Sequence, residues 1–293
     1  MITAILGLLT AITYGAADFF AALATRGLRV LAVTLGSSIA GLAALLTLSP
    51  IFGADYSDAS LAWGVIGGVC SVGALTALYA SLAIGPISII SPLGALVSAI
   101  VPAVIGVVVL GDKFSPTGWL AIGVGLVAVV LIGIVPDSTG SRPKLKGIVL
   151  AIVAGVGIGL TVTSLAQSPH DSGIAPVIIT RFTACVILVL LNLPWIIQVA
   201  KKRQPLMIES VLAPKPGKLL AILIAAGLFD AAANILFTLA SRSGSLTVAG
   251  VLTALYPLGT ILLARVVLKE RITRVQGVGI FLALVASVLL AIG

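Results

Sequence analysis

The sequence predicts an all-α integral membrane protein with ten transmembrane helices. Three observations predict it: 60% of the 293 residues are hydrophobic, only 9% are charged, and the mean hydropathy is +1.28. Soluble domains carry about 25% charged residues, because their surfaces need polar cover. The composition therefore excludes a soluble enzyme, a nucleic-acid binder and a disordered chain.

Ten apolar segments are long enough to cross the hydrocarbon core, which takes roughly 20 residues of helix. The predicted spans are, in chain order, about 3–24, 30–51, 60–83, 86–110, 115–136, 147–167, 174–199, 218–240, 245–268 and 273–292. Each span is separated from the next by charged residues, proline or glycine, at 26–29, 55–58, 85–86, 111–113, 137–146, 168–171, 201–218, 242–244 and 269–274. No connection is long enough to hold a soluble domain.

The basic residues predict the orientation in the membrane. Thirteen of the seventeen Lys and Arg residues lie in the odd-numbered connections, whereas the even-numbered connections hold only Lys113 and Arg242. Basic residues gather in cytoplasmic loops. We therefore expect a multi-pass protein of the cytoplasmic (inner) membrane with both termini extracytoplasmic.

The chain contains an internal repeat. At an offset of 158 residues, the segment from Val108 to Ser115 aligns with the segment from Val266 to Thr273, and the acidic, basic, apolar and hydroxyl residues coincide. This divides the chain into five-helix halves, 1–140 and 141–293. Because five is odd, the second half is inverted, and inverted repeats are typical of transporters with a substrate site near the midplane.

These features resemble the drug/metabolite transporter (DMT) superfamily, and its EamA-type branch in particular. The resemblance rests on the 5+5 spans, the segments Gly111-Asp112-Lys113-Phe114-Ser115 and Glu270-Arg271-Ile272-Thr273, Arg181-Phe182, and the Gly-rich Tyr14–Phe19 segment. It departs from the usual pattern in Asp112-Lys113, where Glu precedes the basic residue in the family. The resemblance implies two inverted five-helix repeats around a central cavity, alternating access, and export of amino acids or related small metabolites.

Ionisable groups inside spans are costly, so each is a candidate functional residue. Asp230 lies about 12 residues into the eighth span, or about 18 Å along it at 1.5 Å per residue, near the midplane. Asn234 and Phe237 share its helical face. Burial disfavours the charged form of a carboxylate, so Asp230 could bind a proton, a substrate amine, or each in turn. The alternative is a structural Asp bonded to neighbouring helices.

Four further residues are candidate substrate ligands. Arg181 could hold a substrate carboxylate, pair with Asp230 or Asp18, or extend to the interface. Asp18, late in the first span, could face a vestibule or pair with Arg26 or a neighbouring helix. Tyr79, which aligns with Phe237 in the repeat, and Tyr256 could contact a substrate, although core packing is the simpler explanation of each one taken singly.

Prolines and glycines indicate where helices bend and where they pack. Pro92, Pro102 and Pro257 lie within the fourth and ninth spans, and a proline inside a helix frees a carbonyl. These positions are candidates for bending during gating. The pairs Gly64/Gly68 and Gly155/Gly159 have the small-xxx-small spacing of closely packed membrane helices.

The sequence thus favours a secondary or facilitative transporter of a small metabolite such as an amino acid, with protons as a candidate coupling ion. A multidrug or nucleoside-type carrier of the same fold is the first alternative. An integral-membrane lipid-modifying enzyme is the second, but we find no catalytic cluster, metal site or phosphate-binding loop. We expect no cofactor and no nucleic-acid partner, a small-molecule substrate in a lipid bilayer, and a monomer or homodimer.

The orientation can be tested with a reporter fused after Gly293. We expect an extracytoplasmic signal, such as active alkaline phosphatase, because the even-numbered side carries almost no basic residues. A cytoplasmic signal would show that the charge bias does not set the topology of this chain.

Overall fold

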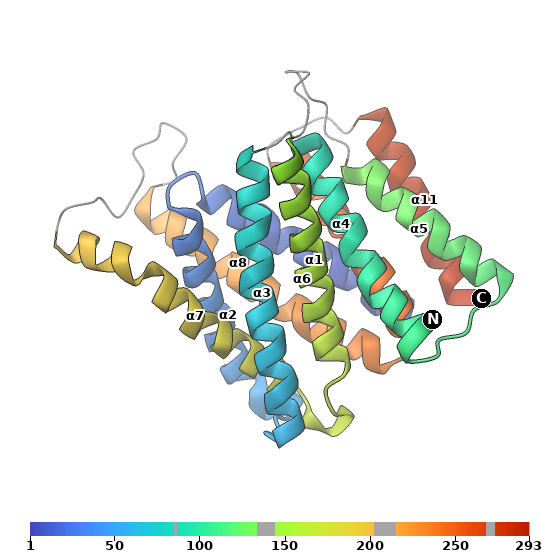
Figure 1. The fold of residues 1–293 in the computed structure, drawn as a ribbon, viewed down its shortest axis with the longest axis horizontal. Helices are drawn as coiled ribbons and strands as arrows, with labels where there is room; N and C mark the ends of the chain where they lie inside the picture. Colours follow the sequence, from blue (N-terminus) through green and yellow to red (C-terminus); the bar gives the residue numbers. More distant parts are fainter. Residues whose placement is uncertain (85–86, 134–143, 202–214, 268–272, 293) are drawn as a thin grey trace.

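The computed structural model describes residues 1–84, 87–133, 144–201, 215–267 and 273–292. These residues form a bundle of helices (Figure 1), with no strand in the described ranges beyond one bridge between Ala54 and Gly173. The elements are α1 (Ile2–Ala24), α2 (Val30–Phe52), α3 (Asp58–Ile84), α4 (Ile87–Val104), η1 (Ile105–Val109), α5 (Pro116–Gly133), α6 (Leu145–Ala166), η2 (His170–Ser172), α7 (Ala175–Ala200), α8 (Pro216–Arg242), α9 (Leu246–Thr253), α10 (Pro257–Val267) and α11 (Arg274–Ile292).

The ten predicted spans are confirmed as helical segments in the predicted order. Six described helices, namely α1, α2, α3, α6, α7 and α8, are each long and apolar enough to cross a membrane, and the remaining spans contain shorter apolar helices. Two spans are irregular. The fourth ends in the π-helical turn η1, and the ninth is divided into α9 and α10 by a turn at Ala254–Tyr256.

The side chains are distributed as a bilayer requires. Large apolar side chains lie exposed on the outside, for example Leu145, Leu190 and Phe281 at 76%, 62% and 65% exposure. Many fully buried side chains are small, such as Ala11 and Ala95. Lipid tails are as apolar as leucine, so helices associate through close contact between small residues rather than by expelling water.

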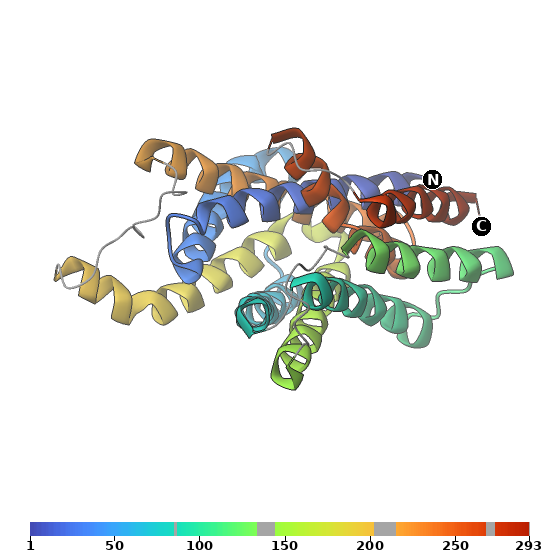
Figure 2. The same ribbon diagram turned by 90° about the horizontal axis from the view of Figure 1, so that it is seen from above.

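The contacts between helices form the same pattern in the first five spans and in the last five. α1 packs on α8 as α6 packs on α3, and α2 packs on α8 as α7 packs on α3. Three further pairs, α2 with α7, α4 with α9, and α5 with α11, join helices that correspond to each other in the predicted repeat. Figures 1 and 2 show α5 and α11 side by side at the edge of the bundle near both termini, with the C-terminal end of α7 at the opposite edge. The boundary between residues 140 and 141 lies outside the described residues.

Glycines let the helices touch. The predicted pair Gly155/Gly159 packs on α4, where an added Cβ would lie 2.6 Å from the Gly94 carbonyl oxygen or 2.5 Å from the Cβ of Val101. The pair Gly64/Gly68 packs in the same way on α7. The predicted close packing is therefore confirmed at both sites, within one chain.

Gly15 brings α1 against the turn in the ninth span. A Cβ at Gly15 would lie 2.4 Å from the Tyr256 carbonyl oxygen and 2.6 Å from the Cα of Gly259. The Thr260 hydroxyl donates a hydrogen bond of 3.1 Å to the Gly15 carbonyl oxygen. Backbone lies against backbone here, so neither helix has a flexible side chain that could move aside.

This contact predicts that Gly15→Ala lowers the thermal unfolding midpoint of the purified protein in detergent. Overpacking a tight site costs about 1–3 kcal/mol. Gly123→Ala is the matched control, because nothing lies within 4 Å of a Cβ at Gly123 and alanine favours a helix by about 1 kcal/mol. Equal midpoints for the two variants would contradict the packing argument.

Candidate functional site

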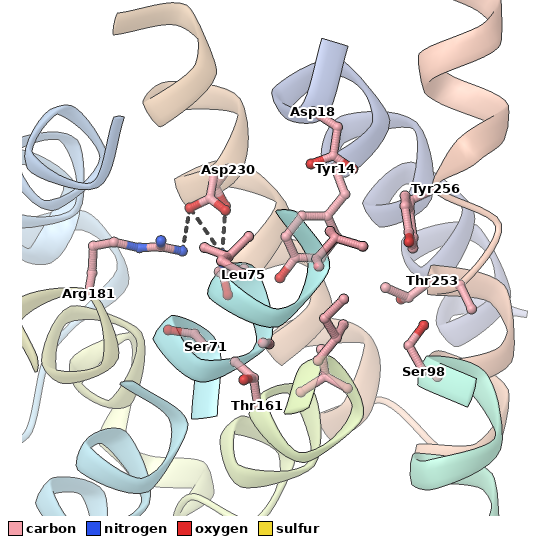
Figure 3. Close-up of a pocket in the computed structure, with 17 residues that line it drawn as sticks. Tyr14, Asp18, Ser71, Leu75, Ser98, Thr161, Arg181, Asp230, Thr253 and Tyr256 are labelled. Atoms are coloured by element: carbon pink, nitrogen blue, oxygen red, sulfur yellow. Dashed lines mark hydrogen bonds and ion pairs between the residues drawn. The ribbon is translucent and has the colours of Figure 1, made fainter. Parts of the chain in front are cut away.

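A cavity lies inside the bundle, between helices from the first and the second part of the chain. Seven helices contribute to its wall, namely α1, α3, α4, α6, α7, α8 and α9, together with the turn that follows α9. Its polar lining comprises Tyr14, Asp18, Ser71, Ser98, Thr161, Arg181, Asp230, Asn234, Thr253 and Tyr256, most of which are labelled in Figure 3. The remaining lining is apolar, with leucine, isoleucine, valine and alanine side chains from several helices.

Arg181 and Asp230 form an ion pair at one side of the cavity. The Nη2 atom of Arg181, on α7, contacts the Oδ2 atom of Asp230, at the middle of α8. The Asn234 side-chain amide donates to the Asp230 carbonyl oxygen at 2.8 Å and to the Asp230 carboxylate at 3.4 Å. Arg181 is only 8% exposed, and such a charge inside a membrane protein requires a counter-ion. Asp230 provides that counter-ion.

Asp18 is the second carboxylate of the cavity. It follows Tyr14 by one turn of α1, so both side chains lie on one helical face. Asp18 also lines a smaller cavity, whose wall shares Leu75, Arg181 and Asp230 with the larger one. Asp18 is exposed, and it makes no ion pair with any residue in the part of the chain that the structure describes. Its carboxylate therefore faces the cavities without a counter-ion.

The turn at Ala254–Tyr256 forms the opposite side of the cavity. Pro257 occupies the first position of α10, where the absence of an amide proton costs no helical hydrogen bond. In Figure 3 the side chains of Tyr256 and Thr253 lie on the other side of Tyr14 from Arg181. The hydroxyl of Thr253 and the Nε of Arg181 are buried and have no hydrogen-bond partner among the described residues.

The structure brings five of the seven predicted ligand residues to this cavity: Asp18, Arg181, Asp230, Asn234 and Tyr256. Phe237 is instead fully buried in an apolar cluster with Leu45 and Leu165. It shares the helical face of Asp230, but seven residues place it about 10 Å farther along the axis at 1.5 Å per residue. The side chains of Tyr79 and Pro92 lie outside what the structure describes.

The two other predicted gating prolines have distinct surroundings. Pro102 is buried between α6 and α9: a Cβ at Gly159 would lie 3.3 Å from it, and a Cβ at Gly250 would lie 2.5 Å from it. Pro257 begins the helix that follows the break. Their part in gating stays a prediction, although both lie where the fourth and ninth spans meet their neighbours.

The sequence analysis assigned no role to several lining residues, chiefly Tyr14, Ser71, Ser98, Thr161 and Thr253. Tyr14 could have been found, because it precedes Asp18 by one helical turn. The hydroxyl residues gave no signal, because serine and threonine in membrane helices commonly donate to the carbonyl of the preceding turn. Ser71, Ser98 and Thr161 all do so here.

The comparisons with known proteins agree with this architecture. The model of a family described as "EamA-like transporter family" matches residues 145–292. A solved structure, titled only "Crystal structure of protein", aligns with 99% of this chain and 98% of its own, with a TM-score of 0.75 and 16% identity. At that identity the likeness shows the fold alone. No match was found among curated proteins.

The ion pair predicts a coupling between its two residues. Arg181→Ala should lower the unfolding midpoint by several degrees, because it leaves the Asp230 carboxylate without its counter-ion. Arg181→Ala combined with Asp230→Asn should recover part of that loss, since an amide needs no counter-ion. Melting curves of the wild type, both single variants and the double variant measure the coupling. Purely additive changes would show that the pair contributes nothing to stability.

Proposed function

We propose that this chain, which belongs to the EamA-like transporter family, exports a small amphipathic metabolite such as an amino acid by alternating access. The family makes it a multi-pass membrane transporter of the drug/metabolite type. The observation that carries the finer proposal is the cavity inside the bundle, with two carboxylates and a guanidinium at its wall. A mostly apolar cavity with a few polar groups suits a small organic solute.

Alternating access requires that one end of the bundle be sealed while the other is open. Two clusters of hydrogen bonds connect neighbouring segments at the end of the bundle where α8 ends and α9 begins. Arg242 donates to the carbonyl oxygens of Gly173 and Pro169, each at 2.9 Å. At the same end the Asp112 carboxylate accepts hydrogen bonds from the hydroxyls of Ser245 and Thr247, at 2.5 and 2.8 Å. These contacts support a seal at this end.

The smaller cavity extends toward the other end. Besides the charged groups, its wall includes Ala21 from the last turns of α1 and Val33 from the first turn of α2. These residues flank the first connection, which carries Arg26 and Arg29 and is predicted to be cytoplasmic. A cavity that extends toward the predicted cytoplasmic side suits the loading step of an exporter.

The charged groups suit coupling to protons. A carboxylate can exchange a proton for a positively charged substrate group, and the two then compete for one site. Asp230 can take part only when it separates from Arg181, so proton entry would loosen the contact between α7 and α8. Facilitated diffusion without a coupled ion is the alternative mechanism.

A multidrug or nucleoside-type carrier is the second candidate. It is favoured by Tyr14 and Tyr256, which line the cavity together with apolar side chains such as Leu78 and Ile158. Flat, apolar solutes would pack well on such a surface. The experiment below uses no preset list of compounds, so it distinguishes the two candidates.

We expect cells that overproduce the wild type to accumulate a compound in the medium that cells producing Asp230→Asn do not. Asp230→Asn should abolish export or uncouple it, because the amide neither exchanges a proton nor holds Arg181 by charge. The measurement is untargeted metabolite profiling of the medium at matched membrane levels of the two proteins. Asp55→Asn, which changes an exposed carboxylate outside both cavities, is the control and should export as the wild type does. Equal export by Asp230→Asn would remove Asp230 from the mechanism.

A further inference from the structure

The charges that line the cavity do not balance. Three charged groups from the described residues line it, namely Asp18, Arg181 and Asp230. Arg181 and Asp230 neutralise each other, which leaves Asp18 as one carboxylate without an ion-pair partner among the described residues. A solute with a single positive charge would neutralise the cavity. An anion would instead be repelled by the Asp18 carboxylate in a medium of low dielectric constant.

The surroundings of Asp18 suit an organic cation. Tyr14 lies one turn before it on α1, and Tyr256 lines the same cavity from the turn after α9. In Figure 3 the ring of Tyr14 lies between Asp230 and Tyr256 and is directed into the space between the helices. Aromatic faces attract ammonium groups within about 6 Å and also pack on apolar carbon. The site therefore offers a carboxylate for the charge and rings for the body of the solute.

The broken ninth span supplies independent support. α9 has eight residues and ends at the cavity wall, to which its last turn contributes Gly250 and Thr253. The carboxyl end of a helix carries partial negative charge and favours cations. Thr253 lines the cavity and is 94% buried, and its hydroxyl has no hydrogen-bond partner among the described residues. A buried hydroxyl without a hydrogen-bond partner at a cavity wall points to a ligand that donates or accepts a hydrogen bond there.

We propose that the cavity selects a monovalent organic amine, with the ammonium group on Asp18 and an aromatic or apolar body against Tyr14 and Tyr256. The Arg181–Asp230 pair stays closed when the amine binds, so the site offers no free cation to a substrate carboxylate. This inference rests on the proposed transport function. Among small amphipathic metabolites it selects amines without a carboxylate, in place of the amino acid given there as an example.

Three probes of nearly equal shape test the charge selectivity: phenethylamine (a cation), phenylalanine (a zwitterion) and 3-phenylpropionate (an anion). Binding to the purified full-length protein in lipid nanodiscs is measured by isothermal titration and by the shift in unfolding midpoint. We expect phenethylamine to bind at least tenfold more tightly than phenylalanine, and 3-phenylpropionate not to bind.

The variants test the assignment to Asp18. Asp18→Asn should weaken phenethylamine binding at least tenfold while it leaves the unfolding midpoint of the ligand-free protein near that of the wild type, because no ion pair is broken. Asp55→Asn, an exposed carboxylate outside both cavities, should bind phenethylamine as the wild type does. Tyr256→Leu should weaken phenethylamine binding by a smaller factor, because the carboxylate remains.

The inference is overturned if phenylalanine or 3-phenylpropionate binds as tightly as phenethylamine, if Asp18→Asn binds phenethylamine unchanged, or if none of the three probes binds. Flux in proteoliposomes separates this result from the proposed function. Asp18-dependent binding of phenethylamine without flux would refute transport and keep the site. Saturable flux of phenylalanine with no preference for the amine would keep transport and refute the site.

Discussion

The ion pair between Arg181 and Asp230 is the interaction on which the interior of this bundle depends. A guanidinium and a carboxylate in the hydrocarbon core are each costly to insert, and either one is more costly still without its partner. The pair joins α7 to α8, two helices that otherwise share few contacts. It also sets the charge of the cavity, since it takes one positive and one negative group out of the balance and leaves Asp18. The packing of α7 on α8 and the charge of the cavity thus both depend on one contact.

Small residues determine how closely the helices can approach that pair. Two glycines contact the backbone of a neighbouring helix or turn so closely that a Cβ atom would not fit. Gly15 contacts the turn at Tyr256, and Gly227 contacts α2 at Ser37. The contact at Gly227 brings α8 against α2 three residues before Asp230. Close packing of this kind replaces the hydrophobic driving force that a bilayer does not supply. It also explains why large side chains cover the outside of the bundle rather than its interior.

The sequence predicted most of the fold, because apolar spans and their charged boundaries follow directly from the thickness of a bilayer. It located Arg181, Asp230 and Asp18 for the same reason, since charges inside apolar segments stand out. It placed Phe237 on the correct face of α8, but the sequence does not define where the cavity ends along the helix. It predicted a bend at Pro257, where the structure has a break between α9 and α10. A proline in an apolar segment gives the same sequence pattern for a kinked helix and for two separate helices. The role of Asp112 depends on partners 133 and 135 residues away, and no local pattern encodes such a distance.

The bond between Asp112 and the start of α9 has a mechanical consequence. Ser245 and Thr247 hold the first turn of α9 to the segment that follows η1, and the turn at Ala254–Tyr256 ends the same helix eight residues later. α9 therefore spans about 12 Å at 1.5 Å per residue, with its first turn bonded to Asp112 and its last turn at the cavity wall. A ligand at the cavity wall and the hydrogen bonds of Asp112 therefore act on opposite ends of one two-turn helix, which links the cavity to the end of the bundle that we propose is sealed.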